Sequence, residues 1–191
     1  MSEFTMILTE QDDRVLTITL NRPDDLNPLS WQVLNEIDSV LDRARHDDSV
    51  GVIVIGAAGK AFSTGYDLRE AHWITSQYPA NFDDHVDIRK DRDDVHVIVD
   101  YWMKLWRYPK PLIAKVQGDC LSGAGELLGV CDLAIVSEHA RFGHPAGRDL
   151  GIPPSIMFWP MLIGYRKTKE LLYTSRLIPA HEAQQIGLVN E

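Results

Sequence analysis

The chain has 191 residues, of which 45% are hydrophobic and 25% charged, and its formal net charge is −9. This length and balance predict one globular domain, residues 1–191, with a single core. The charge argues against nucleic acid or an anionic membrane surface as a partner, and no stretch is long and apolar enough to span a membrane. The acidic N-terminus lacks a signal-peptide pattern, so we expect a cytoplasmic protein whose two cysteines, Cys120 and Cys131, are reduced.

The first part of the chain predicts a hairpin, a helix and a strand. Residues 6–20 predict a hairpin, with a turn at residues 12–13 followed by the alternating apolar and polar side chains of residues 14–20. Ser30 is a suitable N-cap for a helix whose apolar residues then recur at helical spacing. Residues 50–57 form a continuous apolar run, which predicts a fully buried strand.

The middle of the chain is more varied in composition. Residues 67–74 can begin a helix, whereas residues 75–94 are polar, charged and interrupted by proline, which predicts a mobile surface loop or flap. Residues 93–108 predict a helix that stops at the prolines following it. Residues 112–116 predict another buried strand.

The last part continues the alternation of strand and helix. A strand is expected at residues 133–137 and an irregular Gly- and Pro-rich loop at residues 139–154. Residues 155–174 predict helical structure, and residues 180–187 predict a last helix. Apolar strands that alternate with helices indicate βαβ units with parallel pairing, and hence the α/β class.

Two glycine-rich turns, residues 59–68 and 118–127, stand out because each follows a predicted strand and opens a predicted helix. Such a turn leaves backbone N–H groups unpaired at a helix N-terminus, where the helix dipole favours negative charge. Two of these turns could converge on one oxygen. Alternatively, they are ordinary tight turns with no ligand. Neither matches the phosphate-binding or dinucleotide-binding glycine patterns.

Several segments, in order, resemble the crotonase (enoyl-CoA hydratase/isomerase) family. They are VLTITLNRPDDLNPLS, AFSTGYDL, KPLIAKVQGDCLSGAGELLGVCDLAI, ARFGHP, LGIPP and IPAHEAQQIGLVN. The resemblance covers nearly the whole chain. It implies a crotonase-like spiral of ββα units with peripheral helices, and an acyl-CoA thioester as the partner. It implies no cofactor beyond the coenzyme A that the substrate carries.

The resemblance also implies a site. The thioester carbonyl would be held by the backbone N–H groups of Tyr66 and Gly123, where an enolate oxygen develops. The Tyr66 side chain replaces a commoner small residue and would narrow the acyl pocket. Glu126 matches one of the two acid/base glutamates of the hydratases. Without the resemblance it would be interpreted as a helix-N-terminal acid that complements the dipole.

The second glutamate of the family is missing, because Ala146 stands where it would follow the Phe-Gly-His-Pro segment. Asp149 or His144 could replace it, or either could be an ordinary loop residue. We expect Asp149, which Arg148 would hold ionised, and His144 is the rival because an imidazole titrates in the useful pH range.

Contacts to coenzyme A are expected from the first glycine-rich turn and from one further cation. Lys60 and, more weakly, Arg22 are candidates for its phosphates, and either could equally be a solvated surface charge. The residues expected to border the adenine are Ser63, Gly65, Asp67 and Leu68. The histidines form no metal-ligand spacing, so no metal is expected.

The resemblance leaves the reaction open. Hydration of a 2-enoyl-CoA is the leading hypothesis, and an isomerase or a C–C or thioester hydrolase on the same scaffold is the first alternative. A non-catalytic acyl-CoA binder is the second. Family members usually continue beyond the GLVN segment with helices that build a trimer, and these helices are not seen in this sequence. A homotrimer or a dimer of trimers is therefore expected for the full-length form.

Overall fold

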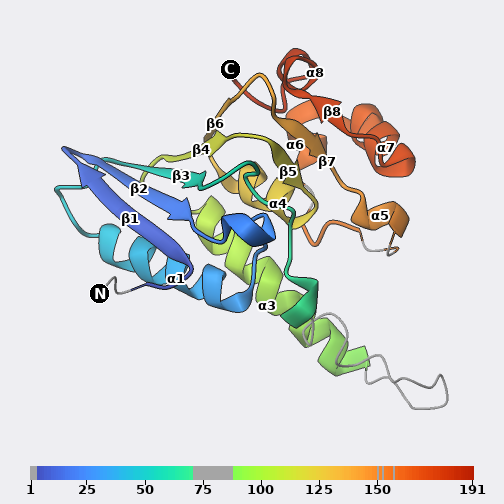
Figure 1. Ribbon diagram of the computed structural model, residues 1–191. Helices are drawn as coiled ribbons and strands as arrows, with labels where there is room; N and C mark the ends of the chain where they lie inside the picture. Colours follow the sequence, from blue (N-terminus) through green and yellow to red (C-terminus); the bar gives the residue numbers. More distant parts are fainter. Residues whose placement is uncertain (1–3, 71–87, 150, 152, 157) are drawn as a thin grey trace.

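The computed structural model describes residues 4–70, 88–149, 151, 153–156 and 158–191. It contains two sheets with helices packed around them (Figure 1). The larger sheet has the strand order β1-β2-β3-β4-β6, and the smaller has the order β5-β7-β8. The strands are β1 Ile7–Asp12, β2 Val15–Leu20, β3 Val52–Ala57, β4 Leu112–Val116, β5 Asp119–Leu121, β6 Leu133–Val136, β7 Arg141–Gly143 and β8 Ile178–Pro179.

The larger sheet confirms the predicted hairpin and the predicted parallel pairing. β1 and β2 are antiparallel, and β2, β3, β4 and β6 run parallel to one another. The prediction that β3 is fully buried was wrong, because Ile53 and Ile55 are buried while Val52 and Val54 are partly exposed. An apolar run cannot reveal which face of a strand the helices cover.

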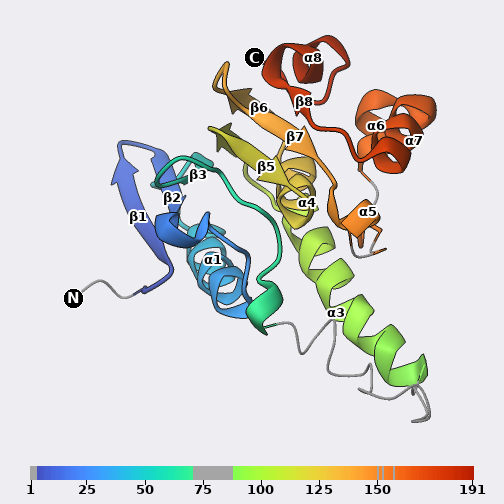
Figure 2. The same cartoon turned by 45° about the vertical axis from the view of Figure 1, so that its right-hand side comes forward.

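Helices pack against the larger sheet and beside the smaller one (Figure 2). The helices are α1 Trp31–Ala44, α3 Ile88–Trp106, α4 Gly123–Val130, α5 Ala146–Asp149, α6 Trp159–Ile163, α7 Tyr165–Thr174 and α8 Ala180–Gln185. Two short 3₁₀ turns lie at Pro23–Asp25 and Leu68–Glu70. None of the helices in the described residues is both long enough and apolar enough to cross a membrane.

Helix α1 begins at the predicted cap. The Ser30 hydroxyl accepts a hydrogen bond from the Val33 N–H at 3.2 Å, so one of the unpaired donors of the first turn is satisfied. The helix then buries Leu34, Ile37 and Leu41 against the sheet. Capping and apolar spacing therefore agree on the same helix.

Helix α3 begins earlier than the sequence indicated. It starts at Ile88, inside the segment that we expected to be a loop. Arg89, Arg92 and Asp93 are exposed on it, so the polar composition reports solvent exposure and not an absence of helix. The expected mobility of residues 75–87, and the end of the helix expected at 67–74, lie outside the described residues.

The smaller sheet was not predicted. Strand β5 falls in a segment that we interpreted as a turn, and β7 and α5 lie in the loop expected to be irregular. β7 pairs with β5 in parallel and with β8 in antiparallel orientation. These short strands depend on pairing between distant segments, which local patterns cannot show. The helix expected from residue 155 begins only at Trp159, where Pro160 occupies its first turn.

Both cysteines are free thiols, as expected. Cys120 is buried in strand β5, and burial raises its pKa. Burial also raises the pKa of Cys131, to about 12. Neither thiol is a ready nucleophile near neutral pH.

The capping interaction of Ser30 yields a test of this part of the fold. We expect Ser30→Ala to lower the free energy of unfolding by about 1 kcal/mol, because the Val33 N–H loses its acceptor. Chemical denaturation measures this change. Ser39→Ala is the matched control, since the exposed Ser39 hydroxyl only donates to the Asn35 carbonyl of the same helix. Equal, negligible losses in the two variants would contradict the capping role.

Candidate active site

The two glycine-rich turns are joined by backbone hydrogen bonds. Ser63 donates its N–H to the Asp119 carbonyl and accepts from the Leu121 N–H, each at 3.0 Å. On the other side, Leu29 donates to the Gly65 carbonyl at 2.8 Å and accepts from the Asp67 N–H at 3.0 Å. Residues 63–67 are therefore held between β5 and the segment that precedes α1.

Glycine is needed where the turns touch. Gly65 has a φ of 98°, and a Cβ added there would lie 2.9 Å from both the Gly123 nitrogen and the Leu121 carbonyl oxygen. A Cβ added at Gly123 would lie 2.8 Å from two carbons of the Tyr66 ring. Any larger residue at either position would push the turns apart. The main chain beside Tyr66 therefore lies against the start of α4.

Gly123 presents its N–H at the N-terminus of α4. None of the hydrogen bonds within the described part of the chain takes up this N–H. The preceding residue, Ser122, has a φ of 51° and donates its own N–H to the Gly143 carbonyl at 2.9 Å. A non-glycine residue in this region stores strain of roughly 1–3 kcal/mol, and such strain clusters at functional sites. The strained Ser122 thus lies directly before the Gly123 donor.

Glu126 lies in the first turn of α4 and is buried. Its Oε1 accepts from the Ser155 N–H at 2.5 Å, and its Oε2 accepts from the Ser155 hydroxyl at 2.7 Å. The Tyr66 hydroxyl donates to the same Oε2. Burial raises the pKa of Glu126, and these hydrogen bonds oppose the rise without cancelling it. A carboxyl group in this state is suited to proton transfer near neutral pH.

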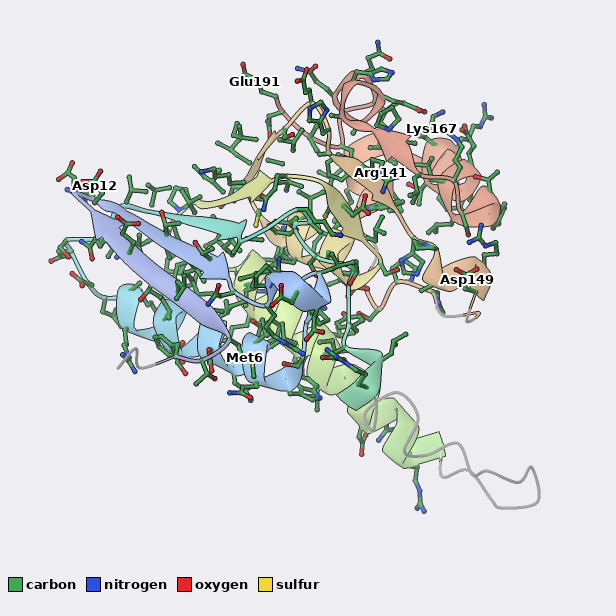
Figure 3. The ribbon with its side chains drawn as sticks, viewed as in Figure 1. Met6, Asp12, Arg141, Asp149, Lys167 and Glu191 are labelled. Carbon is green, nitrogen blue, oxygen red and sulfur yellow. The ribbon has the colours of Figure 1, made fainter. Side chains whose placement is uncertain are left out.

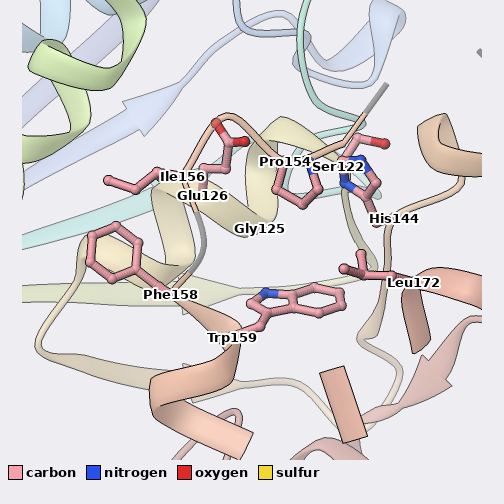
Figure 4. A pocket seen from close by; sticks show the side chains of 9 residues that line it. All are labelled: Ser122, Gly125, Glu126, His144, Pro154, Ile156, Phe158, Trp159 and Leu172. Atoms are coloured by element: carbon pink, nitrogen blue, oxygen red, sulfur yellow. The ribbon is translucent and has the colours of Figure 1, made fainter. Parts of the chain in front are cut away.

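Glu126 and His144 line the same pocket (Figure 4). His144 follows β7 and is buried, and in the close-up it lies near Ser122 and Pro154. The remaining wall is mainly apolar. The lining residues are Ser122, Gly125, Glu126, His144, Pro154, Ile156, Phe158, Trp159 and Leu172. A carboxyl and an imidazole in a largely apolar pocket are typical of an acid/base site.

Asp149 is not among the residues that line this pocket. It ends α5 at the edge of the molecule, where its side chain is half exposed (Figure 3). The expected ion pair is present, with Arg148 Nε 2.6 Å from a carboxylate oxygen. The hydrogen bond from Arg148 lowers the pKa of Asp149. The structure thus brings Tyr66, Glu126 and His144 together and leaves Asp149 outside.

Arg22 and Asp67 are engaged with each other. They form an ion pair of 2.8 Å in which the carboxylate is buried, and Arg69 binds the same carboxylate at 3.1 Å. Burial acts to raise the pKa of Asp67, but hydrogen bonds from the two arginines outweigh it and hold the value at about 2. This cluster anchors the turn that carries Tyr66. The Arg22 guanidinium is already paired with carboxylates, which makes it a weaker candidate for binding a phosphate.

The other residues predicted to contact coenzyme A lie on the same turn. Lys60 and Leu68 are exposed, whereas Ser63 is buried and its hydroxyl accepts from the Gly65 N–H at 3.1 Å. Ser63 therefore shapes the turn. Lys60 is the predicted contact whose charge faces solvent, and its binding role stays a prediction.

Sequence reasoning missed two residues of this site. Ser155 clamps Glu126 through both its N–H and its hydroxyl, and nothing in the local sequence marks it for that contact. Trp102 of α3 lies on the helix predicted at residues 93–108, where an aromatic residue is most often part of the core. It is indeed fully buried, but its indole N–H also donates to the Tyr66 hydroxyl at 2.8 Å.

Comparisons with known proteins point to one family. The family model for enoyl-CoA hydratase/isomerase matches residues 10–191. A probable enoyl-CoA hydratase of Mycobacterium bovis is 35% identical over 98% of this chain and 68% of its own. A short-chain-enoyl-CoA hydratase of Clostridium acetobutylicum is 33% identical over 99% of this chain and 69% of its own.

Solved structures confirm the predicted fold. An enoyl-CoA hydratase/isomerase from Xanthobacter autotrophicus superimposes with a TM-score of 0.86 at 35% identity, covering 98% of this chain and 66% of that one. This chain therefore spans about two thirds of the length of the proteins that it matches. The joined glycine-rich turns, the buried carboxylate and these matches lead to one conclusion: the chain belongs to the enoyl-CoA hydratase/isomerase family, the crotonases.

Proposed function

We propose that this protein is an enoyl-CoA hydratase that adds water across the double bond of a 2-enoyl-CoA. The observation that carries the proposal is the buried carboxyl of Glu126, one helical turn beyond the Gly123 N–H that no described protein group takes up. The substrate supplies its own coenzyme A, so the reaction needs no further cofactor.

The backbone donors would stabilise the charge that develops during hydration. As the water oxygen bonds to the β carbon, the electrons of the double bond move toward the thioester carbonyl oxygen. N–H groups of Gly123 and Tyr66 directed at that oxygen would each contribute about 3 kcal/mol. The dipole of α4 adds to this stabilisation, because its positive end faces the same point.

Glu126 would move the protons. Its carboxylate takes one proton from the water as the C–O bond forms. The protonated Glu126 then gives that proton to the α carbon of the enolate, which restores the carboxylate. Burial raises the pKa of Glu126, so a proton is easier to hold and release near neutral pH than on an exposed carboxylate.

His144 is the better candidate for the second acid/base group. It lines the pocket with Glu126, and an imidazole titrates in the useful range. Asp149 is exposed and paired with Arg148, so it is the weaker candidate for this role. His144, just after β7, would thus replace the missing second glutamate of the family, and Asp149 of α5 would not.

The remaining parts of the proposal concern binding and assembly. Lys60 would contact a phosphate of coenzyme A, with Gly65 and Leu68 beside the adenine. We propose a single core domain for this chain and, in the full-length form, a homotrimer or a dimer of trimers in the cytoplasm. Exposed apolar side chains on α6 and α7, including Met161 and Tyr165, support an association through that side.

Glu126→Gln tests the acid/base assignment. We expect turnover of short 2-enoyl-CoAs to fall by about 10²-fold or more, because the amide cannot take up or give the proton. Binding of the product should persist, since the carbonyl donors are untouched. Loss of the enoyl-thioester absorbance measures turnover, and calorimetry measures binding. Glu138→Gln, at an exposed position away from the pocket, is the control. Full turnover by Glu126→Gln would refute the assignment.

His144→Gln and Asp149→Asn decide the second group. We expect His144→Gln to lower kcat by about tenfold or more, on the scale of lost acid–base assistance, while Asp149→Asn keeps wild-type kcat. The same absorbance assay applies, with melting temperatures to check the fold. The reverse order of effects would restore Asp149 and reject His144. Conversion of other acyl-CoA thioesters, but not of 2-enoyl-CoAs, would favour an isomerase or hydrolase.

A further inference from the structure

The Tyr66 side chain forms part of a chain of polar groups that leads from the core to Glu126. The Trp102 indole N–H donates to the Tyr66 hydroxyl at 2.8 Å, and this hydroxyl contacts Glu126 Oε2 and lies 3.2 Å from Ser155 Oγ. The tyrosine ring lies directly over Gly123. The side chain thus bridges the backbone donors and the acid/base group.

The direction of the hydrogen bond between Trp102 and Tyr66 follows from the chemistry of the indole. An indole N–H can only donate, so Trp102 occupies one acceptor site of the Tyr66 oxygen. The single Tyr66 proton is then free to point at Glu126. Ser155 gives both its N–H and its hydroxyl proton to the same carboxylate. This arrangement suits an ionised Glu126, because each of these groups can donate to the carboxylate.

The same groups can serve a protonated Glu126. The Tyr66 oxygen has a second acceptor site, so it can accept from a carboxyl proton on Oε2. Its own proton can then rotate to Ser155 Oγ, which lies 3.2 Å away. Only hydroxyl rotations are needed, and the heavy atoms stay in place. Tyr66 can thus hold the carboxyl group in both states of the proposed cycle.

We propose that Tyr66 is a positioning residue. Its hydroxyl, which Trp102 and Ser155 hold in place, orients Glu126 and favours the ionised form of this carboxyl group in the resting enzyme. This inference rests on the proposed acid/base role of Glu126. It is separate from the role of the Tyr66 backbone, because the hydroxyl can be removed without changing the main chain.

The hydroxyl has a defined electrostatic effect. A donated hydrogen bond stabilises the carboxylate over the carboxyl form, so its removal raises the pKa of Glu126 further. The other titratable group in the pocket lining is His144, and it remains in every variant considered below. The limb of the pH–rate profile that belongs to Glu126 should therefore move to higher pH.

Tyr66→Phe tests the inference, because it keeps the ring over Gly123 and deletes only the hydroxyl. The titration of Glu126 is followed directly by NMR of protein labelled with ¹³C at the glutamate carboxyls, with Glu126→Gln identifying the signal. We expect the titration of Glu126 to move to higher pH and kcat to fall by about tenfold or more with KM unchanged, since a hydrogen bond to a charged group is lost.

Two further variants separate positioning from packing. Ser155→Ala should move the titration in the same direction, because it removes the other hydroxyl donor. Tyr108→Phe should leave both the titration and kcat unchanged, since its buried hydroxyl donates to the Leu41 carbonyl outside the site. A Glu126 titration unchanged in Tyr66→Phe and Ser155→Ala would overturn the inference. If the titration moves but the wild type turns over no 2-enoyl-CoA, the positioning role stands and the proposed function fails.

Discussion

The contact between two turns of backbone is the constraint on which this site depends. At Gly65 and Gly123 the main chains lie so close that a single added carbon would collide with a nitrogen, a carbonyl oxygen or the Tyr66 ring. The paired bonds between Ser63 and β5 hold the turns at that distance. Because backbone groups make the contact, side-chain identity in these turns is limited chiefly by size. The contact between the main chains can therefore accommodate a side chain as large as that of Tyr66.

That tolerance has a consequence for the chemistry. With its ring against Gly123, Tyr66 extends toward Glu126, and its hydroxyl also contacts Trp102 and Ser155. On the outer side, the buried Asp67 and the two arginines that bind it secure the same turn. The turn is thus held by ion pairs on one side and by the hydrogen bond to Glu126 on the other. Donors and carboxyl are positioned as one unit.

The sequence predicted the elements that follow local rules. The capped helix after Ser30 and the parallel strands agree with the structure. The smaller sheet was not predicted because strands such as β5 and β7 are stabilised by pairing with distant segments of the chain. The contact of Ser155 with Glu126 was missed for the same reason, because the two residues lie far apart in the sequence. Asp149 was preferred over His144 because Arg148 would hold it ionised. That ion pair forms, but on the exposed helix α5, whereas His144 is buried just after β7.

A crystal structure of the protein with acetoacetyl-CoA bound tests the central claim most directly. If the contact between the turns creates an oxyanion hole, the thioester oxygen will lie about 2.7–3.2 Å from the backbone nitrogens of both Tyr66 and Gly123. The acyl group will then extend toward Glu126. A thioester oxygen bound elsewhere, or bound by only one of the two nitrogens, would contradict the account.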